Sequence, residues 1–303
     1  MSRYPKHSPR FAGSRKILGA ASLALFVLSH SGSASAQDAD ALRARQAALG
    51  EQLANNQFGR PLVLVSTEAS GNLKGDVYAI VKQPFSVVGP ALQGTDHWCD
   101  ILILHLNVKG CASRGTGATS TLSLAVGRKF DQPLDDTRKV DFSYRLATST
   151  ATYLQVLLNA DVGPLDTKNY RIVLEAIPID AHSSFVHMSY SYSYGLAARI
   201  AMQGYLATLG RDKVGFSIVE RKSDGTPVYV GDFRGVIERN AMRYYLAIDA
   251  YLSAYALPPA EQSEKRIREW ITNVERYPRQ LHEMDRDEYL MMKRKELARQ
   301  ASG

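Results

Sequence analysis

The chain has 303 residues, a formal net charge of +7 and 45% hydrophobic residues, a proportion that is ordinary for a globular protein. Five of the positive charges lie in the first sixteen residues, so the chain without residues 1–36 carries a charge of about +2. This near-balance gives no basic footprint on a folded domain, and no nucleic-acid partner is expected.

Residues 1–36 have the features of a targeting segment. A basic stretch without acidic residues, 1–16, precedes an apolar run at 17–28, and an Ala-Ser-Ala tripeptide then ends at Ala36. These three parts predict a secretory signal peptide cleaved near Ala36–Gln37, and hence a periplasmic or secreted protein. The alternative is an uncleaved membrane anchor, for which an apolar run of twelve residues is short.

The remaining 267 residues can bury a large core and suit one elaborated domain, or one domain with a helical appendage. A weak apolar stripe predicts a helix over 38–56. Two strand-like runs, 62–68 and 76–82, then flank a turn-rich segment, SGNLKG. Residues 84–94 follow as a short helix, with proline at its start and glycine at its end.

The chain has two cysteines, Cys99 and Cys111. In an exported protein they are expected to form a disulfide. Bridged Cα atoms lie within about 7 Å, so the stretch between them has to fold back, and a short helix over 96–106 followed by a turn would allow this. The alternative is a metal site with His97 and His105, but this spacing matches no strong zinc pattern. No metal and no cofactor are expected.

After a Gly/Ser/Thr loop, period-2 alternation recurs in five runs separated by turn residues. The runs are TLSLAVGRKF, VDFSYRLA, TYLQVLLNAD, YRIVLEAIPI and FVHMSYSYSYG. This pattern is typical of an antiparallel meander with one buried face. Charged residues opposite the apolar faces are expected to form an outer cross-strand lattice. They are Asp141, Arg145, Arg171 and Glu175.

The period changes after the last strand. Helical spacing is found over 196–210, then two short strands flank an Asp-Gly turn, and a long helix is predicted over 236–256. Residues 261–300 are helical and mix both charge signs densely. Such mixing argues against strong membrane attachment and leaves open a transient contact with a membrane surface.

This order of elements resembles the START-like (helix-grip, SRPBCC) superfamily over roughly residues 62–210. The resemblance rests on element order and on three stretches, GDVYAIVKQPFSVV, DHWCDIL and SYGLAARIAMQGYLATLG. It implies an α+β fold in which a curved antiparallel sheet wraps around a long final helix, with a hydrophobic ligand between them. The chain would then divide into an N-terminal helix at 37–60, a helix-grip domain at 61–210, and a hairpin with C-terminal helices at 211–303. This extension would pack on the domain or form a lid or docking surface.

In such a fold the last strand would direct one row of side chains toward the final helix. The row comprises Met188, Tyr190, Tyr192 and Tyr194, which we expect to bind a ligand. Tyrosine combines an apolar ring with a hydroxyl that needs a partner, which suits an amphipathic, lipid-like molecule. The alternative for each residue is plain core packing.

The helix that begins near residue 236 and the segment before it are dense in charge. Arg234 and Arg243 are expected to bind an anionic head group, because arginine makes bidentate contacts to carboxylate or phosphate. The alternative is a structural ion network that includes Glu238 and Arg239.

No catalytic motif stands out, and His105, His182 and His187 have no nucleophile beside them in the sequence. The favoured interpretation is therefore an exported, non-enzymatic binding or carrier protein for a hydrophobic or lipid-like small molecule. Two alternatives stay open. One is a cavity-based enzyme of cyclase or hydrolase type, and the other is an interaction protein with a filled core.

Overall fold

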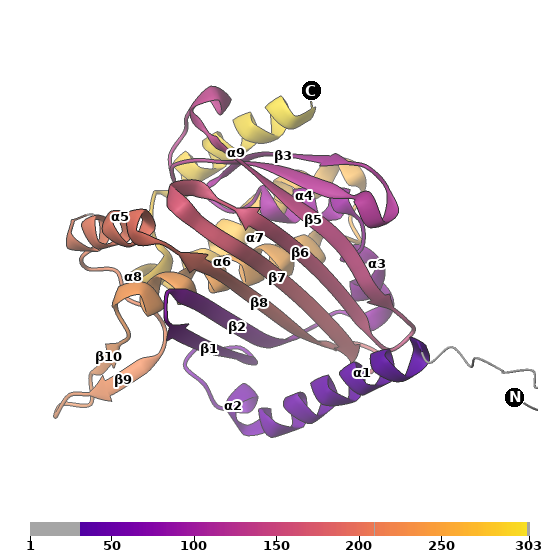
Figure 1. Cartoon of the computed structure of the whole chain (residues 1–303). Helices are drawn as coiled ribbons and strands as arrows, with labels where there is room; N and C mark the ends of the chain where they lie inside the picture. The colour runs from indigo at the N-terminus through magenta and orange to yellow at the C-terminus, as the bar shows by residue number, and fades with distance from the viewer. Residues whose placement is uncertain (1–30, 209, 302–303) are drawn as a thin grey trace, which may run out of the picture.

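The computed structural model describes residues 31–208 and 210–301 as an α+β fold built on one large antiparallel sheet (Figure 1). The eight strands lie in the order β1-β2-β8-β7-β6-β5-β4-β3, so β1 and β3 are its edges. They are β1 (Leu62–Ala69), β2 (Asn72–Val81), β3 (Val108–Arg114), β4 (Thr121–Val126), β5 (Arg138–Ser149), β6 (Leu154–Val162), β7 (Thr167–Pro178) and β8 (Ser184–Tyr194).

Helices cover both faces of this sheet, and a small hairpin stands apart from it. The helices are α1 (Ser31–Ala48), α2 (Gly50–Ala54), α3 (Phe85–Ala91), α4 (Thr95–Leu102), α5 (Leu196–Ala207), α6 (Asp232–Ala254), α7 (Pro259–Val274), α8 (Pro278–Leu281) and α9 (Arg286–Ala301). The hairpin pairs β9 (Ile218–Arg221) with β10 (Pro227–Tyr229). None of the described helices is long and apolar enough to cross a membrane.

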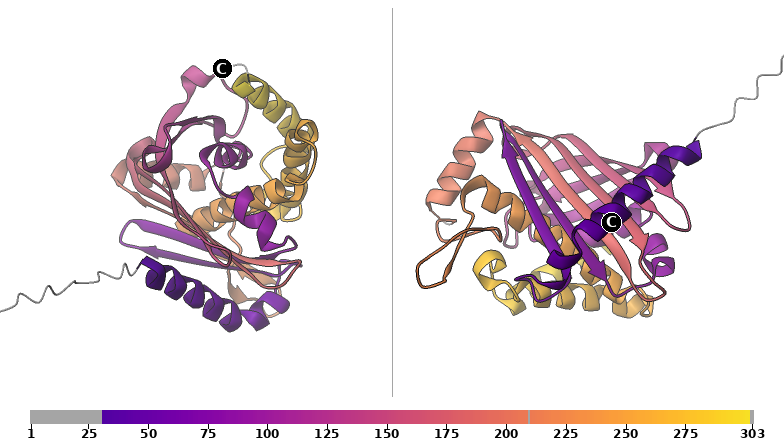
Figure 2. Two further views of the ribbon diagram at one scale, coloured as in Figure 1. Left: turned by 90° about the vertical axis from the view of Figure 1, so that its right-hand side faces the viewer. Right: turned by 90° about the horizontal axis from the view of Figure 1, so that it is seen from below.

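The concave face of the sheet wraps around α6, which makes the fold a helix-grip (Figure 2). This helix packs on β1, β2 and β8, while α4 lies beside it and contacts β3 and β4. Sixteen of the 23 residues of α6 are buried, because α7 covers the side that faces away from the sheet. Period-2 strands with one apolar face thus enclose a helix that is buried on nearly all sides.

Helix α6 comes very close to the sheet at Gly75 of β2. A Cβ atom at this position would lie 2.8 Å from the Cβ of Ala241 and 3.4 Å from the carbonyl oxygen of Ile237. Real Cβ atoms do not approach this closely, so only glycine allows the helix to reach this depth. The contact fixes α6 over the β1-β2-β8 side of the sheet.

The expectation that the 196–210 helix is the one held by the sheet is wrong. That segment forms α5, which projects from one end of the sheet together with the β9–β10 hairpin (Figure 1). Its apolar side chains are largely in solvent, with Leu196 71% and Ile200 60% exposed. The held helix is α6. Apolar residues lie on nearly all sides of α6, so it can be buried between the sheet and α7, whereas α5 has exposed apolar residues. The helix-grip therefore extends to residue 254 rather than 210.

The disulfide between Cys99 and Cys111 is confirmed, with a Cα–Cα distance of 5.3 Å. Its helix, α4, ends at Leu102 rather than near residue 106, and a short turn leads directly into β3. With both sulfurs bonded to each other, the alternative of a metal site built on these cysteines is wrong. Within the described part of the chain, no group of three or more His, Cys, Asp or Glu is placed to hold a metal ion.

The N-terminal helices α1 and α2 cross the convex face of the sheet. Four of their apolar side chains pack on a patch of outward-facing aromatic and aliphatic residues. This second core comprises Ala39, Leu42, Leu49, Leu53, Val63, Tyr78, Tyr153, Ile177 and Phe185. Most of the predicted signal peptide, residues 1–30, lies outside the described residues, and α1 begins at Ser31.

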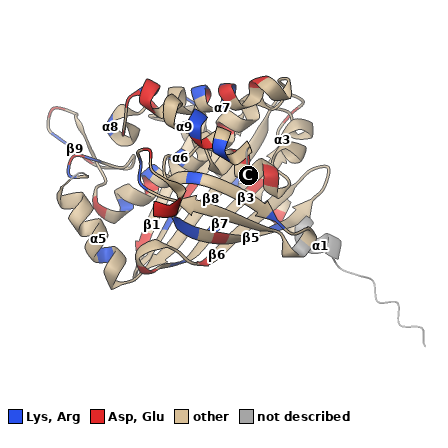
Figure 3. Cartoon of the chain, turned by 90° about the horizontal axis from the view of Figure 1, so that it is seen from above, with Lys and Arg blue, Asp and Glu red and all other residues tan. Residues whose placement is uncertain are grey.

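The C-terminal helices pack on the grip through a buried ionic cluster and present mixed charge to solvent. The Glu296 carboxylate lies 3.1 Å from Lys109 Nζ of β3 and 2.7 Å from Lys293 Nζ, and all three side chains are fully buried. Burial lowers the pKa of Lys293 to about 8. Figure 3 shows acidic and basic residues interspersed over α7 and α9. The expected solvated, mixed-charge surface is thus present, and one side of α9 is docked on β3.

A polar cluster crosses three neighbouring strands on the convex face. His187 of β8 donates from Nδ1 to Glu175 of β7 at 2.7 Å and from Nε2 to Asp76 of β2 at 2.8 Å, and its ring stacks on Tyr78. Burial disfavours the imidazolium, but the two carboxylates outweigh it and raise the pKa of His187. Of the charged residues expected to interact across the strands on this face, Glu175 does so, and it interacts with Asp76 through His187, which lies between them.

The close contact at Gly75 predicts a double-mutant coupling. Gly75→Ala should lower the free energy of unfolding by about 1–3 kcal/mol, because the added methyl group overlaps Ala241. The Gly75→Ala/Ala241→Gly double variant should be less destabilised than the sum of the two single variants, as measured by urea unfolding. Gly204→Ala, which meets no atom within 4 Å, is the matched control. Strict additivity of the two changes would refute the contact.

The raised pKa of His187 predicts a pH effect on stability. The imidazolium pair stabilises the fold fully below the unfolded-state pKa of about 6.5, and this stabilisation is lost as pH rises through the folded-state pKa. As pH rises above about 6.5, the free energy of unfolding of the wild type should therefore decline relative to that of His187→Gln. Urea unfolding at each pH measures this, and parallel profiles of the two proteins would contradict the assignment.

Candidate cavity between the sheet and the central helix

A cavity of about 160 Å³ lies between the sheet and α6, on the side of the helix away from β1 and β2. Strands β4, β5, β7 and β8, helix α6 and the turn after α4 form its walls. The lining residues are His105, Asn107, Leu124, Val126, Val140, Phe142, Pro164, Tyr170, Tyr190, Asn240 and Tyr244. The cavity is the space that remains because α6 is drawn toward Gly75 and α4 covers only β3 and β4.

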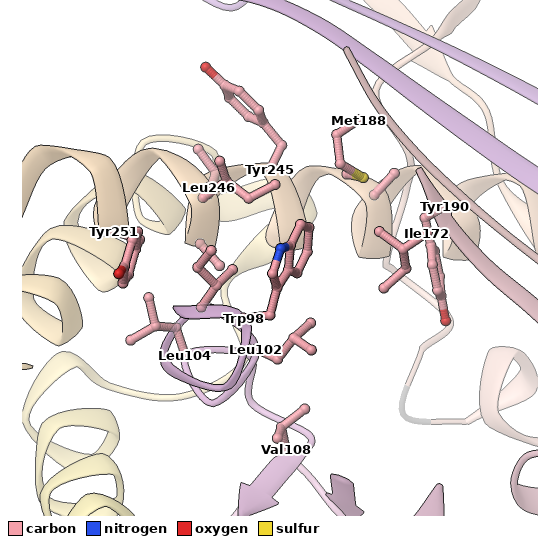
Figure 4. Packing of buried hydrophobic residues seen from close by; sticks show 14 of the residues in the cluster. Trp98, Leu102, Leu104, Val108, Ile172, Met188, Tyr190, Tyr245, Leu246 and Tyr251 are labelled. Atoms are coloured by element: carbon pink, nitrogen blue, oxygen red, sulfur yellow. The ribbon is translucent and has the colours of Figure 1, made fainter. Parts of the chain in front are cut away.

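Aromatic rings form one wall of the cavity. The Tyr190 ring centroid lies 4.9 Å from that of Tyr244 on α6 and 6.3 Å from that of Tyr170 on β7. Burial raises the pKa of Tyr190 and Tyr244 far above the usual value, so both hydroxyls stay protonated at neutral pH. The wall is therefore apolar with neutral hydroxyl groups in it. Figure 4 shows Tyr190 beside Ile172 and Met188 on the face of the sheet turned toward α6.

His105 adds a single hydrogen-bond donor to this wall. The backbone N–H of Asn107 donates to its Nδ1 at 3.2 Å, so the proton of the neutral ring is on Nε2. Burial, followed by the nearby Arg243 cation, holds the pKa of His105 well below its usual value, and the ring stays neutral. Its Nε2 is buried and has no hydrogen-bond partner among the described residues. A buried donor without an acceptor is unfavourable, and an acceptor on a bound molecule would satisfy it.

The described titratable residues of the cavity are one histidine and three tyrosines. Among the described residues that line it there is no carboxylate, thiol or serine, and Asn240 supplies the only side-chain amide besides Asn107. Burial keeps the ring of His105 and the hydroxyls of the three tyrosines neutral. The site can accommodate an apolar group and donate a hydrogen bond to one end of it.

The predicted tyrosine row faces inward as expected, but only part of it reaches the cavity. Met188, Tyr190, Tyr192 and Tyr194 are all buried in the concave core. Tyr190 lines the cavity, whereas Met188 is core packing. Tyr192 donates to the sulfur of Met202, and the Tyr194 hydroxyl donates to Glu68 at 3.0 Å near the end of the sheet. The alternative of core packing therefore describes three of the four residues.

The two predicted arginines do not converge on one group. Nine residues of helix separate Arg234 from Arg243, a rise of about 14 Å. Arg234 is 38% exposed and contacts Ser66 Oγ at 3.1 Å, while Arg243 is buried and pairs with Glu283 at 2.7 Å. The joint binding of one head group by both is therefore wrong, because the two side chains have different surroundings.

Glu238 has a structural role, but it does not form the alternative ion network with Arg239. Its fully buried carboxylate accepts hydrogen bonds from the backbone N–H groups of Phe216 at 2.5 Å and Ser217 at 2.9 Å, and from two serine hydroxyls. It fastens the segment before the β9–β10 hairpin to α6. Together with the bond from Arg239 to the carbonyl of Val214, this carboxylate ties the end of the insertion between β8 and α6 to the helix.

Sequence reasoning missed most of the cavity. His105 was treated as a lone histidine, and Tyr170, Asn240 and Tyr244 were not singled out. One signal was available, because Asn240 and Tyr244 are four residues apart and so share one face of a helix. Nothing in the sequence indicates that this face turns toward a void.

No family model matches the chain, and no curated protein matches it. Among solved structures, the chain is similar to norcoclaurine synthase from Thalictrum flavum in complex with dopamine and hydroxybenzaldehyde, at 12% identity over 48% of this chain and 91% of that chain, with a TM-score of 0.32. It is also similar to Ara h 8.0201, at 12% identity over 60% and 99% with a TM-score of 0.35. A protein from Thermus thermophilus matches at 9% identity over 60% and 99%, with a TM-score of 0.37. At these values no functional residue is transferred.

Proposed function

We propose that the protein is an exported binding or carrier protein that holds a small amphipathic molecule between the sheet and α6. The observation that carries the proposal is the buried Nε2–H of His105, which lacks an acceptor among the described residues and belongs to a residue lining the cavity of about 160 Å³. The surrounding tyrosines offer an apolar wall with neutral hydroxyls. Such sites are mostly apolar, with a few placed polar groups that orient the ligand.

The volume of the cavity limits the size of the ligand that it can hold. An engineered protein cavity of about 150 Å³ binds benzene, so a cavity of about 160 Å³ suits one ring or a short aliphatic chain. A lipid with two acyl chains is far larger than this. We therefore narrow the lipid-like ligand suggested by the sequence to a small amphiphile with one apolar group and a hydrogen-bond acceptor.

Export and family membership are parts of the same proposal. The basic stretch, apolar run and cleavage site at the start of the chain support export, and a disulfide is typical of proteins in oxidising compartments. The order of strands and helices around α6 supports membership of the START-like superfamily. Binding is favoured over catalysis because the described lining residues include no carboxylate or thiol, and burial keeps His105 and the tyrosines neutral.

The test is a cavity-filling substitution. Val126→Phe should reduce affinity for 3-phenylpropan-1-ol at least tenfold, measured by isothermal titration calorimetry, because the added ring occupies the space of the ligand. Val219→Phe, at an exposed position of β9, is the matched control and should bind like the wild type. Equal affinity of Val126→Phe and the wild type would contradict binding in this cavity.

A further inference from the structure

A second hollow, of about 520 Å³, lies beside the cavity, and we call it the basic cleft. It is formed by the loop after β4, the side of α5, the segment that follows α5 and the segment before α9. Its lining residues are Asn107, Arg128, Lys129, Phe130, Tyr205, Lys213, His282 and Glu283. Asn107 lines both the basic cleft and the cavity, so the two spaces are neighbours.

Cations outnumber carboxylates in the basic cleft. Among the described residues that line it, Glu283 is the only carboxylate, and its Oε1 lies 2.7 Å from Lys129 Nζ and 2.7 Å from an Nη atom of Arg243. Lys213 donates to the backbone carbonyl of His282, a neutral acceptor. One carboxylate oxygen therefore faces two cations, and the other cations of the cleft have no acidic partner among the described residues of its wall.

Arg239 extends this excess of positive charge into the protein. Its side chain is on α6, the residue is only 2% exposed, and its Nη1 donates to the carbonyl of Val214 at 3.2 Å. It also lies beside the Tyr205 hydroxyl of the basic cleft. Among the described residues no carboxylate forms an ion pair with Arg239. The Glu283 carboxylate is near enough to favour its charge, but the like charge of Arg243 opposes it more strongly.

A buried guanidinium without a counterion is unfavourable. Burial and Arg243 lower the pKa of Arg239 accordingly. The neighbouring Arg243 also has a buried Nε without a hydrogen-bond partner among the described residues. Arg243 is paired with Glu283, so Arg239 is the buried cation here without an ion pair, and its planar, multiple donors match carboxylate and phosphate oxygens.

We propose that the basic cleft binds the anionic group, a carboxylate or a phosphate, of the amphiphile whose apolar group occupies the cavity. This inference rests on the proposed function, and it specifies the ligand class as an anionic amphiphile. The exposed ring of Phe130 and the ring of Tyr205 line the basic cleft and offer apolar surface there. Asn107, common to both spaces, marks where the molecule passes from one to the other.

The experiment compares 3-phenylpropionate with 3-phenylpropan-1-ol, which differ only in the charged end, by isothermal titration calorimetry on the purified, disulfide-bonded protein. Inorganic phosphate is titrated separately, monitored by backbone amide NMR shifts. The acid should bind at least tenfold more tightly than the alcohol. Inorganic phosphate should shift amides around residues 127–130 and 282–283 and should compete with the acid.

Two cleft variants make the comparison specific. Arg128→Gln/Lys213→Gln alters partly or fully exposed side chains, and Arg239→Met removes the unpaired buried charge at similar volume. Both should lose the preference for the acid and keep the affinity for the alcohol. Lys222→Gln, in the turn of the β9–β10 hairpin, removes one positive charge elsewhere and should keep the preference.

The outcomes separate the two proposals. Equal binding of acid and alcohol by the wild type would overturn the basic cleft while leaving cavity binding intact. A preference for the acid that survives in both cleft variants would also overturn it. Binding of phosphate alone, with neither phenyl compound bound, would overturn the amphiphile and the proposed function and identify a site for free phosphate. Binding of none of the three would overturn both proposals.

Discussion

The fold depends on the contact between Gly75 of β2 and Ala241 of α6. The absence of a side chain at Gly75 lets the helix approach the sheet to a distance that any Cβ would prevent. That approach sets α6 against β1, β2 and β8, where its apolar residues are buried. On the other half of the sheet, α4 covers β3 and β4 but does not meet α6 along its whole length. The cavity is the consequence of this asymmetric placement.

The insertion between β8 and α6 forms part of the basic cleft, which lies beside the cavity. The buried carboxylate of Glu238 holds the backbone at residues 216–217 and so fixes the end of the insertion to α6. The other end continues from β8 into α5, which presents Tyr205 to the basic cleft. The insertion is therefore not an appendage. It builds a wall that brings Lys213 and Tyr205 next to charged residues of α6 and of the segment before α9.

Charge distribution along α6 follows from these contacts. Its middle is apolar where it meets the sheet, while Glu238, Arg239 and Arg243 face the insertion and the C-terminal segment. Glu238 has a full set of donors, and Arg243 is paired with Glu283. Arg239 donates to a backbone carbonyl and has the Glu283 carboxylate nearby, but it forms no ion pair with a described residue. Buried charge is retained where it is compensated, so the exception at Arg239 is a sign of a role beyond folding.

Strand alternation and compartment chemistry made much of the fold predictable from the sequence. Period-2 patterning identified the strands and the inward face of β8, and the two cysteines indicated the disulfide. The sequence did not identify the held helix, because the 196–210 segment and α6 both have helical spacing and only their partners distinguish them. The sequence does not distinguish Gly75 from any other glycine in a strand, because the requirement for glycine comes from Ala241 of α6, which is distant in the sequence. His105 and Arg239 are candidate ligand-binding residues because the structure shows a buried Nε2 of His105 without a hydrogen-bond partner and an Arg239 without an ion pair among the described residues. The periodicity of a sequence does not indicate which side chains lack such partners.

Native mass spectrometry of the protein, purified from its host cells without detergent, would detect a ligand held in the cavity and the basic cleft. We expect one bound small molecule per chain, released by organic solvent, with one apolar group of about six to ten heavy atoms and an anionic end. A bare chain that also fails to take up ring-sized anionic or neutral compounds would contradict it. The interior would then be a core with an unfilled space, and the C-terminal helices would be the surface to investigate.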